Sequence, residues 1–397
     1  MHLLVLNCGS SSIKFTIFRA SSSLSCLLHG QLEAIGTERA RLILEGPGGQ
    51  QHSEKCPSCD YRQGLERIAD AFRAYDLPPP AGVGHRVVHG GERFRASVVI
   101  DPSVLAAIEA NTPLAPLHNP ANLEGIRLAR SFWPAALQVA VFDTAFHQSM
   151  PPQAFRYAVP NTWYEEFGIR RYGFHGISHA YVAKRTAEYL DKSLDNLNLI
   201  TLHLGNGASA TAIAKGCSVD TSMGLTPLEG LVMGTRSGDL DAGVLLHLLN
   251  QRQMSPEELD RVLNHASGLI GLCGLSDMRR IHTAVAAGDE DARLALDMFC
   301  YRVKKYLGAY LAVLGRVDAI VFTGGIGEHD PEVRSCSLAN LDGFGIRLDE
   351  KKNRRLLTDV MEIQSDRATM KILAVATDEA REIARNMLDL LPRPLEE

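Results

Sequence analysis

Two arginines, a histidine and an aspartate of this 397-residue sequence stand where side chains could act on an anionic substrate. Arg86 lies in a short apolar stretch that ends in paired glycines, and Asp143 directly follows an apolar run typical of a buried strand. His175 precedes a predicted helix, and Arg236 stands between hydroxyl residues in a glycine-rich segment. A guanidinium can bind two oxygens of an oxyanion, and ligands of open α/β sheets gather where strands end. The pattern predicts an anion-binding site.

Each of these residues also has a purely structural interpretation. Asp143 could cap the turn after its strand, and His175 could stand in a surface loop. Arg236 could be a solvated arginine paired with Asp239 or Asp241. The sequence by itself leaves these interpretations open.

Two stretches of the sequence share one pattern of strand, polar turn and strand. The first runs from Leu3 to Phe18 and turns at a glycine and three serines, and the second runs from Leu199 to Ile213 and turns at Gly-Asn-Gly. Glycine allows a sharp turn, and neighbouring N–H groups and hydroxyls suit phosphate oxygens. The first turn is not a Walker loop, because it lacks the lysine motif and continues as a strand. Two such hairpins, one in each half, predict duplicated domains.

Helices and further strands must position these residues. Apolar periodicity predicts helices over 61–75, 102–110, 242–249, 255–263, 292–314 and 378–391, and buried strands over 139–142, 318–323 and 372–376. The helix after His175 is expected to begin with Ser178 as its N-cap. Residues 267–275 are predicted to form a glycine-rich loop. The segment 220–241 has too many glycines for regular structure, which is typical of a functional loop.

The composition argues against several classes of protein. A net charge of −5 argues against a nucleic-acid surface, and no apolar run reaches the ~18 residues of a membrane span. The N-terminus lacks the basic segment of a signal peptide, so we expect a cytoplasmic protein with reduced cysteines. The single Cys56-Pro57-Ser58-Cys59 motif lacks a second ligand pair nearby, which argues against structural zinc. This length predicts two domains.

Seven segments, taken in order, resemble the acetate kinase family of the superfamily that includes actin, sugar kinases and the Hsp70 ATPase. They are residues 7–14, 84–91, 142–147, 171–176, 203–207, 220–241 and 322–328. The resemblance implies an α/β protein with two duplicated actin-like (ribonuclease H-like) domains, each a mixed five-stranded sheet flanked by helices, and an active-site cleft between them. The first domain would comprise residues 1–150 and 377–397, and the second, nucleotide-binding domain residues 151–376. The resemblance also implies a homodimer.

The same resemblance implies reversible, magnesium-dependent transfer of the ATP γ-phosphoryl group directly to acetate, giving acetyl phosphate and ADP. It implies catalytic roles for Asp143, His175 and Arg236, and it places Mg²⁺, which Mn²⁺ could replace, at Asn7 and Glu379. The acetate carboxylate would be held by Arg86, and its methyl group would contact Val88, Leu117, Phe174 and Pro227. The implied ATP contacts are Lys14, His203, Leu204, Gly205, Asn206, Gly207, Asp277, Met278, Arg279, Gly325, Ile326, Gly327, Glu328 and His329.

Two positions depart from the family pattern. His329 stands where asparagine is common, and Ile177 replaces a hydroxyl residue.

The function is not restricted to acetate. A propionate kinase is possible, because one extra methylene changes binding in an apolar pocket by only ~1–3 kcal/mol. The sequence is also compatible with a sugar or polyol kinase, an ATPase of the same superfamily, and a histidine-based metallohydrolase. Arg86 with Arg236 favours an anionic acceptor over the neutral hydroxyl of a sugar or polyol. Acetate would not accelerate turnover by a slow ATPase, and a zinc content below stoichiometric would exclude the metallohydrolase.

Overall fold

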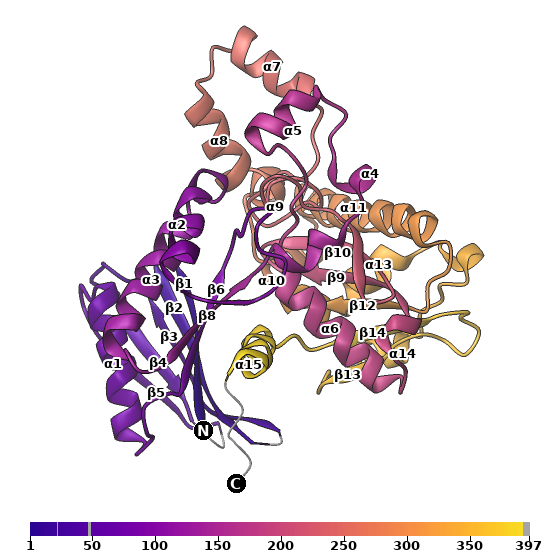
Figure 1. Ribbon diagram of the computed structural model, residues 1–397. Coiled ribbons are helices and arrows are strands. Elements are labelled where there is room, and N and C mark those ends of the chain that lie inside the picture. Colours follow the sequence, from indigo (N-terminus) through magenta and orange to yellow (C-terminus); the bar gives the residue numbers. More distant parts are fainter. Residues whose placement is uncertain (22, 47–48, 392–397) are drawn as a thin grey trace. The chain divides into compact units, whose positions relative to one another are not determined.

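Contacts divide the chain into two compact units, which are described one at a time. The computed structural model describes residues 1–21, 23–46 and 49–391 (Figure 1). The first unit comprises Met1–Phe146 and the segment from Asp378 onward, and the second comprises His147–Thr377. Each unit contains one mixed sheet with helices, so the predicted α/β class is confirmed.

The first unit is built on an eight-stranded sheet with the order β5-β4-β3-β2-β1-β6-β8-β7. Its strands are β1 (His2–Gly9), β2 (Ser12–Ala20), β3 (Leu24–Glu33), β4 (Arg41–Glu45), β5 (Gln51–Lys55), β6 (Gly82–Val87), β7 (Val98–Val99) and β8 (Leu137–Phe142). β1 and β2 form the predicted N-terminal hairpin, in which Gly9 pairs with Ser12. β1, β6 and β8 run parallel, so their C-terminal ends meet at one edge of the sheet.

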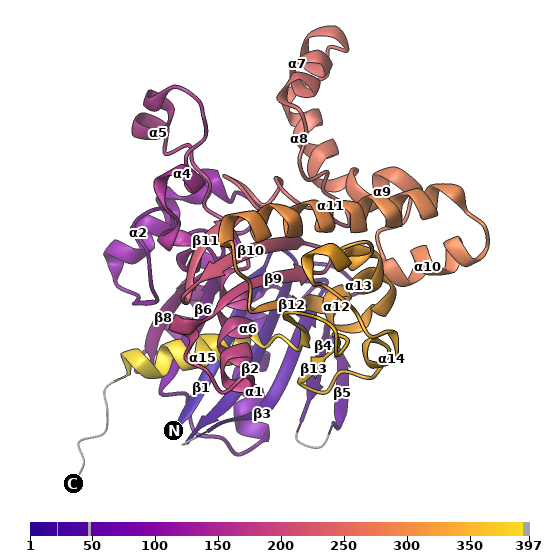
Figure 2. The same cartoon turned by 90° about the vertical axis from the view of Figure 1, so that its right-hand side faces the viewer.

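Helices cover both faces of this first sheet (Figures 1 and 2). They are α1 (Tyr61–Ala74), α2 (Pro102–Ala110), α3 (Asn119–Phe132) and, from the end of the chain, α15 (Glu379–Leu390). Leu4 and Leu6 of β1 point toward α1 and pack with its Leu65 and Ile68 in the core. α15 packs on the opposite face, because this strongly amphipathic helix has an apolar stripe that must be covered.

The second unit is built on a six-stranded sheet with the order β11-β10-β9-β12-β14-β13. Its strands are β9 (Asn198–Leu204), β10 (Ala208–Ala214), β11 (Cys217–Thr221), β12 (Ala319–Thr323), β13 (Val360–Glu362) and β14 (Lys371–Val375). β9 and β10 form the second predicted hairpin, with Leu204 paired to Ala208 around the turn Gly205-Asn206-Gly207. β9, β12 and β14 run parallel.

The second sheet lies between α6 (Gly176–Tyr189) on one face and the long α11 (Glu290–Leu314) on the other (Figures 1 and 2). Phe299, Val303 and Tyr310 of the predicted apolar stripe of α11 are buried. The remaining helices of this unit are α4 (Pro152–Phe155), α5 (Asn161–Phe167), α7 (Ala242–Gln251), α8 (Pro256–His265), α9 (Gly268–Cys273), α10 (Met278–Ala286), α12 (Gly324–His329), α13 (Pro331–Leu338) and α14 (Glu350–Asn353).

The two sheets share a five-stranded core, which supports the predicted duplication. In the first unit the core is β3-β2-β1-β6-β8, and in the second it is β11-β10-β9-β12-β14. Both cores consist of three antiparallel strands followed by two strands parallel to the third. The sheets are larger than the expected five strands, because β4, β5 and β7 extend the first sheet and β13 extends the second.

Two local predictions are wrong, and tertiary contacts explain both. The N-cap of α6 is His175, with φ of 56°, and not Ser178, whose hydroxyl contacts His203 Nδ1 at 2.8 Å. Residues 268–273 form α9 and not a loop. Leu269 is fully buried and its N–H donates to the carbonyl of Met233, so packing against the preceding segment favours a helix there.

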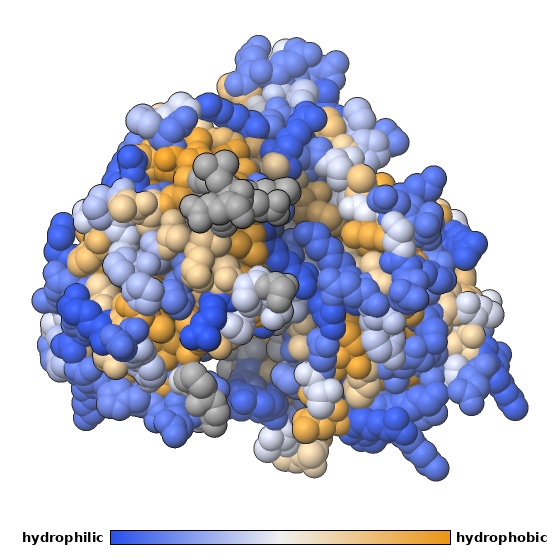
Figure 3. All heavy atoms as spheres, turned by 60° about the horizontal axis from the view of Figure 1, so that its bottom comes forward, coloured by the Kyte–Doolittle hydropathy of each residue, from blue (hydrophilic) through white to orange (hydrophobic). Residues whose placement is uncertain are grey.

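One face of the molecule shows hydrophilic residues around smaller hydrophobic areas (Figure 3). None of the helices in the described part of the chain is long and apolar enough to cross a membrane. α7 has an unusual surface: none of its residues is buried, and Val244 and Leu246 are 42% and 60% exposed.

Candidate active site

Three oxygen-bearing side chains of the first unit converge on the guanidinium of Arg86. Asp143 accepts hydrogen bonds from Arg86 Nη2 at 2.6 Å and from Nε at 3.2 Å, a bidentate arrangement. Asn7 Oδ1 accepts from Nη1 at 3.3 Å, and Glu379 Oε2 lies 3.7 Å from Nε. We call Asn7, Arg86, Asp143 and Glu379 the Arg86 cluster.

Glu379 reaches this cluster because α15 packs tightly on β6. Gly84 and Arg86 are alternate residues of the strand and share one face. A Cβ atom at Gly84 would lie 2.4 Å from Met387 Sδ and 2.6 Å from Ile383 Cγ2, so only glycine lets the helix approach so closely. Glu379 is one helical turn before Ile383 and therefore lies beside Arg86.

Asn7 and Asp143 reach Arg86 from the strands on either side of β6. Leu6 of β1 pairs with His85, so the next residue, Asn7, is a neighbour of Arg86. β8 pairs with β6 as far as Phe142, and the Asp143 N–H then donates to the carbonyl of Val87. The Asp143 carboxylate is bound by Arg86.

Burial and charge act against each other in the Arg86 cluster. Asp143 is 1% exposed, and burial raises the pKa of its carboxyl although the Arg86 guanidinium opposes that shift. Burial also disfavours the charge of Arg86, but the carboxylates of Asp143 and Glu379 outweigh it, and the pKa of the guanidinium lies above its usual value. The cluster therefore holds a cation in a fixed orientation.

His175 and Arg236 of the second unit face a common space beside Gly207. A Cβ atom at Gly207 would lie 3.4 Å from His175 Nε2 and 3.7 Å from Arg236 Nη1, so the missing side chain leaves room between the two groups. His175 Nδ1 contacts Ser209 Oγ at 2.9 Å, and its ring stacks on His203 with centroids 4.3 Å apart. The structure thus brings two of the three predicted catalytic residues together within one unit.

Arg236 is a mostly buried cation with no carboxylate partner among the residues that the structure describes. Its Nη1 makes long contacts of 3.5 Å with the carbonyl of Pro227 and 3.9 Å with Met233 Sδ. Burial lowers the pKa of this guanidinium below its usual value. A desolvated guanidinium without a counter-ion favours binding of an anion from outside the chain.

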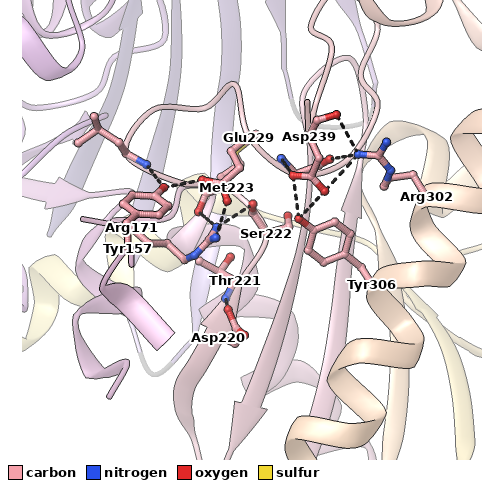
Figure 4. A network of polar contacts seen from close by, with 12 residues as sticks. Tyr157, Arg171, Asp220, Thr221, Ser222, Met223, Glu229, Asp239, Arg302 and Tyr306 are labelled. Atoms are coloured by element: carbon pink, nitrogen blue, oxygen red, sulfur yellow. Dashed lines mark hydrogen bonds and ion pairs between the residues drawn. The ribbon is translucent and has the colours of Figure 1, made fainter. Parts of the chain in front are cut away.

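The two aspartates considered as partners of Arg236 are bound elsewhere, and Figure 4 shows the contacts of Asp239. Asp239 lies 3.1 Å from Arg302 Nη1 and accepts a hydrogen bond from Tyr306 at 3.0 Å. Asp241 accepts the N–H of Gly243 and caps α7. The interpretation of Arg236 as half of a surface ion pair is therefore wrong.

The loop that carries Arg236 is fastened at several points. Glu229, near its middle, pairs with Arg171 and accepts a hydrogen bond from Tyr157 (Figure 4). Gly268, with φ of +64°, starts α9 against the loop, and a Cβ there would lie 2.4 Å from the carbonyl oxygen of Arg236. The backbone of Arg236 is thus held by tertiary contacts that no local sequence pattern specifies.

A cavity of about 820 Å³ in the second unit is lined by many of the residues predicted to bind nucleotide. These are Gly205, Asn206, Asp277, Met278, Arg279, Gly325, Ile326 and His329. The turn after β9, the N-terminus of α10 and the glycine-rich start of α12 therefore meet around one cavity. Its volume lies within the usual range of small-molecule sites.

The remaining predicted nucleotide contacts do not line this cavity. His203, Leu204 and Gly207 belong to the adjoining β9–β10 hairpin, and Gly327 is buried in α12. Glu328 accepts the N–H groups of Gly324 and Thr377, each at 3.0 Å, so its carboxylate is engaged within the protein. Lys14 is exposed on β2 of the first unit.

The four residues predicted to contact a substrate methyl are divided between the two units. Val88 and Leu117 belong to the first unit, and Phe174 and Pro227 to the second. Leu117 is 51% exposed, whereas Phe174 is 1% exposed. The methyl pocket stays a prediction.

The cavity also contains residues that the sequence did not single out. His282 Nε2 lies 2.6 Å from Asp330, and Nδ1 lies 3.4 Å from Glu332. Arg354 and Ser276 line the same cavity. These residues have no motif spacing, and only the packing of separate helices brings them together, so no sequence signal pointed to them.

The oxygen atoms of the Arg86 cluster fit a magnesium ion. Within the described ranges, no group of three or more His, Cys, Asp and Glu side chains is arranged to hold a metal. Mg²⁺ prefers oxygen, keeps several waters and commonly takes only one or two protein ligands beside substrate phosphates. Asn7 and Glu379 offer one such oxygen each, next to the same guanidinium.

Comparison with known proteins gives consistent matches along the chain. A family model described as the acetokinase family matches residues 2–385. An acetate kinase from Syntrophobacter fumaroxidans is 50% identical, over 99% of this chain and 98% of its own length. The crystal structure of Porphyromonas gingivalis acetate kinase has a TM-score of 0.92 at 41% identity and covers 98% of this chain and 100% of its own. A propionate kinase from Francisella tularensis also has a TM-score of 0.92 at 41% identity, covering 97% of this chain and 98% of its own.

Proposed function

Because this chain belongs to the acetokinase family and is a kinase that acts on a carboxylate, we propose that it transfers the γ-phosphoryl group of ATP to acetate. The products are acetyl phosphate and ADP, and the reaction is reversible. The observation that carries the proposal is the mostly buried guanidinium of Arg236, which has no carboxylate partner among the described residues.

No general base is needed for this reaction. A carboxylic acid with a pKa near 4–5 is already ionised at pH 7, so its oxygen can attack phosphorus directly. The obstacle is the approach of two anions and the negative charge on the equatorial oxygens of the transferring group. Fixed positive charge and hydrogen-bond donors are therefore the groups that accelerate the reaction.

Arg236 and His175 stabilise the transferring phosphoryl group. Both side chains face the space beside Gly207, which adjoins residues of the nucleotide cavity in the same hairpin. Because Arg236 has no carboxylate partner in the described part of the chain, its charge is fully available to an incoming anion. Gly207 has no side chain that would occupy the position of that anion.

Arg86 binds the carboxylate of the acceptor, and Asp143 positions Arg86. The bidentate contact uses Nε and Nη2 of the guanidinium and fixes its plane. Asp143 removes no proton, because the acceptor has none to lose. Mg²⁺, when bound with ATP, neutralises phosphate charge, and Asn7 and Glu379 would hold it.

The cavity of the second unit receives the nucleoside part of ATP. Its glycines, Gly205 and Gly325, leave backbone accessible to a ligand, and Asn206, Ser276 and Arg279 add polar groups. His329, which replaces a common asparagine, lines this cavity and could alter the nucleoside contacts.

Acetate is the favoured acceptor, and propionate is the second candidate. Relatives named acetate kinase reach 50% identity, and the acetate kinase and the propionate kinase of known structure are each 41% identical. We further propose a cytoplasmic homodimer. The exposed apolar residues Val244 and Leu246 of α7 support an association surface.

Trapping of acyl phosphate by hydroxylamine tests the proposed function. The purified protein is incubated with Mg-ATP and, separately, formate, acetate, propionate or butyrate. We expect acyl hydroxamate with acetate, a smaller yield with propionate, and none when Mg²⁺ is chelated. No hydroxamate with any of the four acids would refute the proposal, and a higher kcat/KM with propionate would favour the second candidate.

A further inference from the structure

A chain of hydrogen bonds runs from the interior of the second unit to His175. Thr201 Oγ1 lies 2.7 Å from His179 Nδ1, and His179 Nε2 lies 2.8 Å from Ser209 Oγ. Ser209 Oγ in turn lies 2.9 Å from His175 Nδ1. Thr201, His179 and Ser209 are fully buried, so these contacts must satisfy their polar groups.

The protons of this chain can be assigned from its inner end. Within the described part of the protein, Thr201 Oγ1 has one hydrogen-bond partner, His179 Nδ1. The hydroxyl proton of Thr201 therefore goes to that nitrogen, because a buried hydroxyl proton without an acceptor costs about 1–3 kcal/mol. Burial, followed by the nearby His147 and His203, holds the pKa of His179 well below its usual value, so this ring carries one proton. That proton must be on Nε2.

The protons of Ser209 and His175 can be assigned next. His179 Nε2–H donates to Ser209 Oγ, which leaves the Ser209 hydroxyl proton to donate to His175 Nδ1. With Nδ1 accepting, a neutral His175 carries its proton on Nε2. This is the nitrogen that faces the space beside Gly207 and Arg236.

We propose that Thr201, His179 and Ser209 are positioning residues that hold His175 as the Nε2–H tautomer, a hydrogen-bond donor to the oxygens of the transferring phosphoryl group. The inference rests on the proposed role of His175. The opposite tautomer would present a lone pair to an anion, which is repulsive and removes one of the groups that stabilise the transition state. This chain of hydrogen bonds thus prevents His175 from acting as a base toward the phosphoryl site.

Nitrogen NMR of the wild-type protein tests the assignment directly. With ¹⁵N-labelled histidine, and a His175→Gln variant and a His179→Gln variant for assignment, we expect pyridine-like Nδ1 and pyrrole-like Nε2 signals for both rings at pH 7.5. A pyrrole-like Nδ1 at His175 would overturn the proposal. This measurement needs no activity, so it is separate from a failure of the proposed function, which the hydroxamate assay detects.

A matched pair of serine substitutions tests the consequence for the rate. Ser209→Ala removes the donor to His175, whereas Ser218→Ala removes an equally buried hydroxyl that lies 2.9 Å from His147 Nδ1, outside the chain. We expect Ser209→Ala to lower kcat at least about 5-fold and to leave the KM for ATP unchanged. A factor of about 5 corresponds to the loss of a 1 kcal/mol preference for the Nε2–H tautomer over the Nδ1–H tautomer of His175. Ser218→Ala should change kcat less than 2-fold. Equal losses of kcat in both variants would show that the chain of hydrogen bonds does not set the tautomer of His175. A His175 that keeps the Nε2–H tautomer in Ser209→Ala would show the same.

Discussion

Replacement of Arg236 by methionine should make the protein more stable and nearly inactive. Arg236 is mostly buried, has no carboxylate partner in the described part of the chain, and burial lowers the pKa of its guanidinium. The folded protein without substrate therefore bears an uncompensated desolvation cost. Replacing buried ionic groups by apolar ones of similar volume is commonly neutral or stabilising by about 1–4 kcal/mol. Because Arg236 retains some exposure, we expect a gain of about 1–2 kcal/mol in the free energy of unfolding.

The same substitution should remove a large part of the catalysis. An arginine that stabilises a transferring phosphoryl group is worth about 10³-fold or more in kcat, or about 4 kcal/mol. The apparent affinity for ATP should fall much less, because the cavity that receives the nucleoside does not include Arg236. Guanidinium-induced unfolding, steady-state kinetics and ATP titration measure the three quantities.

Arg302→Met is the matched control, because Arg302 is paired with Asp239 at 3.1 Å. It should lower the free energy of unfolding, since Asp239 loses its counter-ion, so the two arginine substitutions should act in opposite directions. The reasoning about Arg236 is refuted if Arg236→Met destabilises the protein as Arg302→Met does, or if kcat and ATP affinity fall by equal factors.

Three further results are expected. Glu379→Gln should raise the Mg²⁺ concentration for half-maximal rate roughly tenfold, and an unchanged Mg²⁺ titration would exclude Glu379 from the metal site. Gly268→Ala should lower the free energy of unfolding by about 2–4 kcal/mol and reduce kcat, because its Cβ would lie 2.4 Å from the Arg236 carbonyl oxygen; wild-type values for both would contradict the fastening of this loop. Burial lowers the pKa of His85 and His147 to about 4, below the unfolded value of about 6.5, so stability present above pH 6.5 is lost as pH falls toward 4. Within that window, each ring changes the free energy of unfolding by about 1.4 kcal/mol per pH unit. His85→Gln should therefore weaken the pH dependence of Tm.

Local patterns were sufficient for many of the elements, but not for every end of them and not for α9. The hairpins at both glycine-containing turns, α2 and α11 follow from periodicity and turn residues. The start of α6 and the existence of α9 did not follow, because distant residues decide them. The Ser178 hydroxyl contacts His203 and does not cap its helix. The hydrogen bond from the Leu269 N–H to the carbonyl of Met233 favours a helix at residues 268–273.

The sequence by itself determined which side chains are available for chemistry and how the hairpin pattern repeats in the two halves. The residue types at Arg86, Asp143, His175 and Arg236 indicated an anionic substrate without geometry, because charge and hydrogen-bonding capacity belong to the side chain. Tertiary structure alone decided the partners of those charges. It bound Asp143 to Arg86, brought Glu379 from the last helix to the same guanidinium, and left Arg236 without a carboxylate in the described part of the chain. Pairing depends on distances between residues far apart in the chain, and those distances exist only after packing has fixed the strands and helices that carry them.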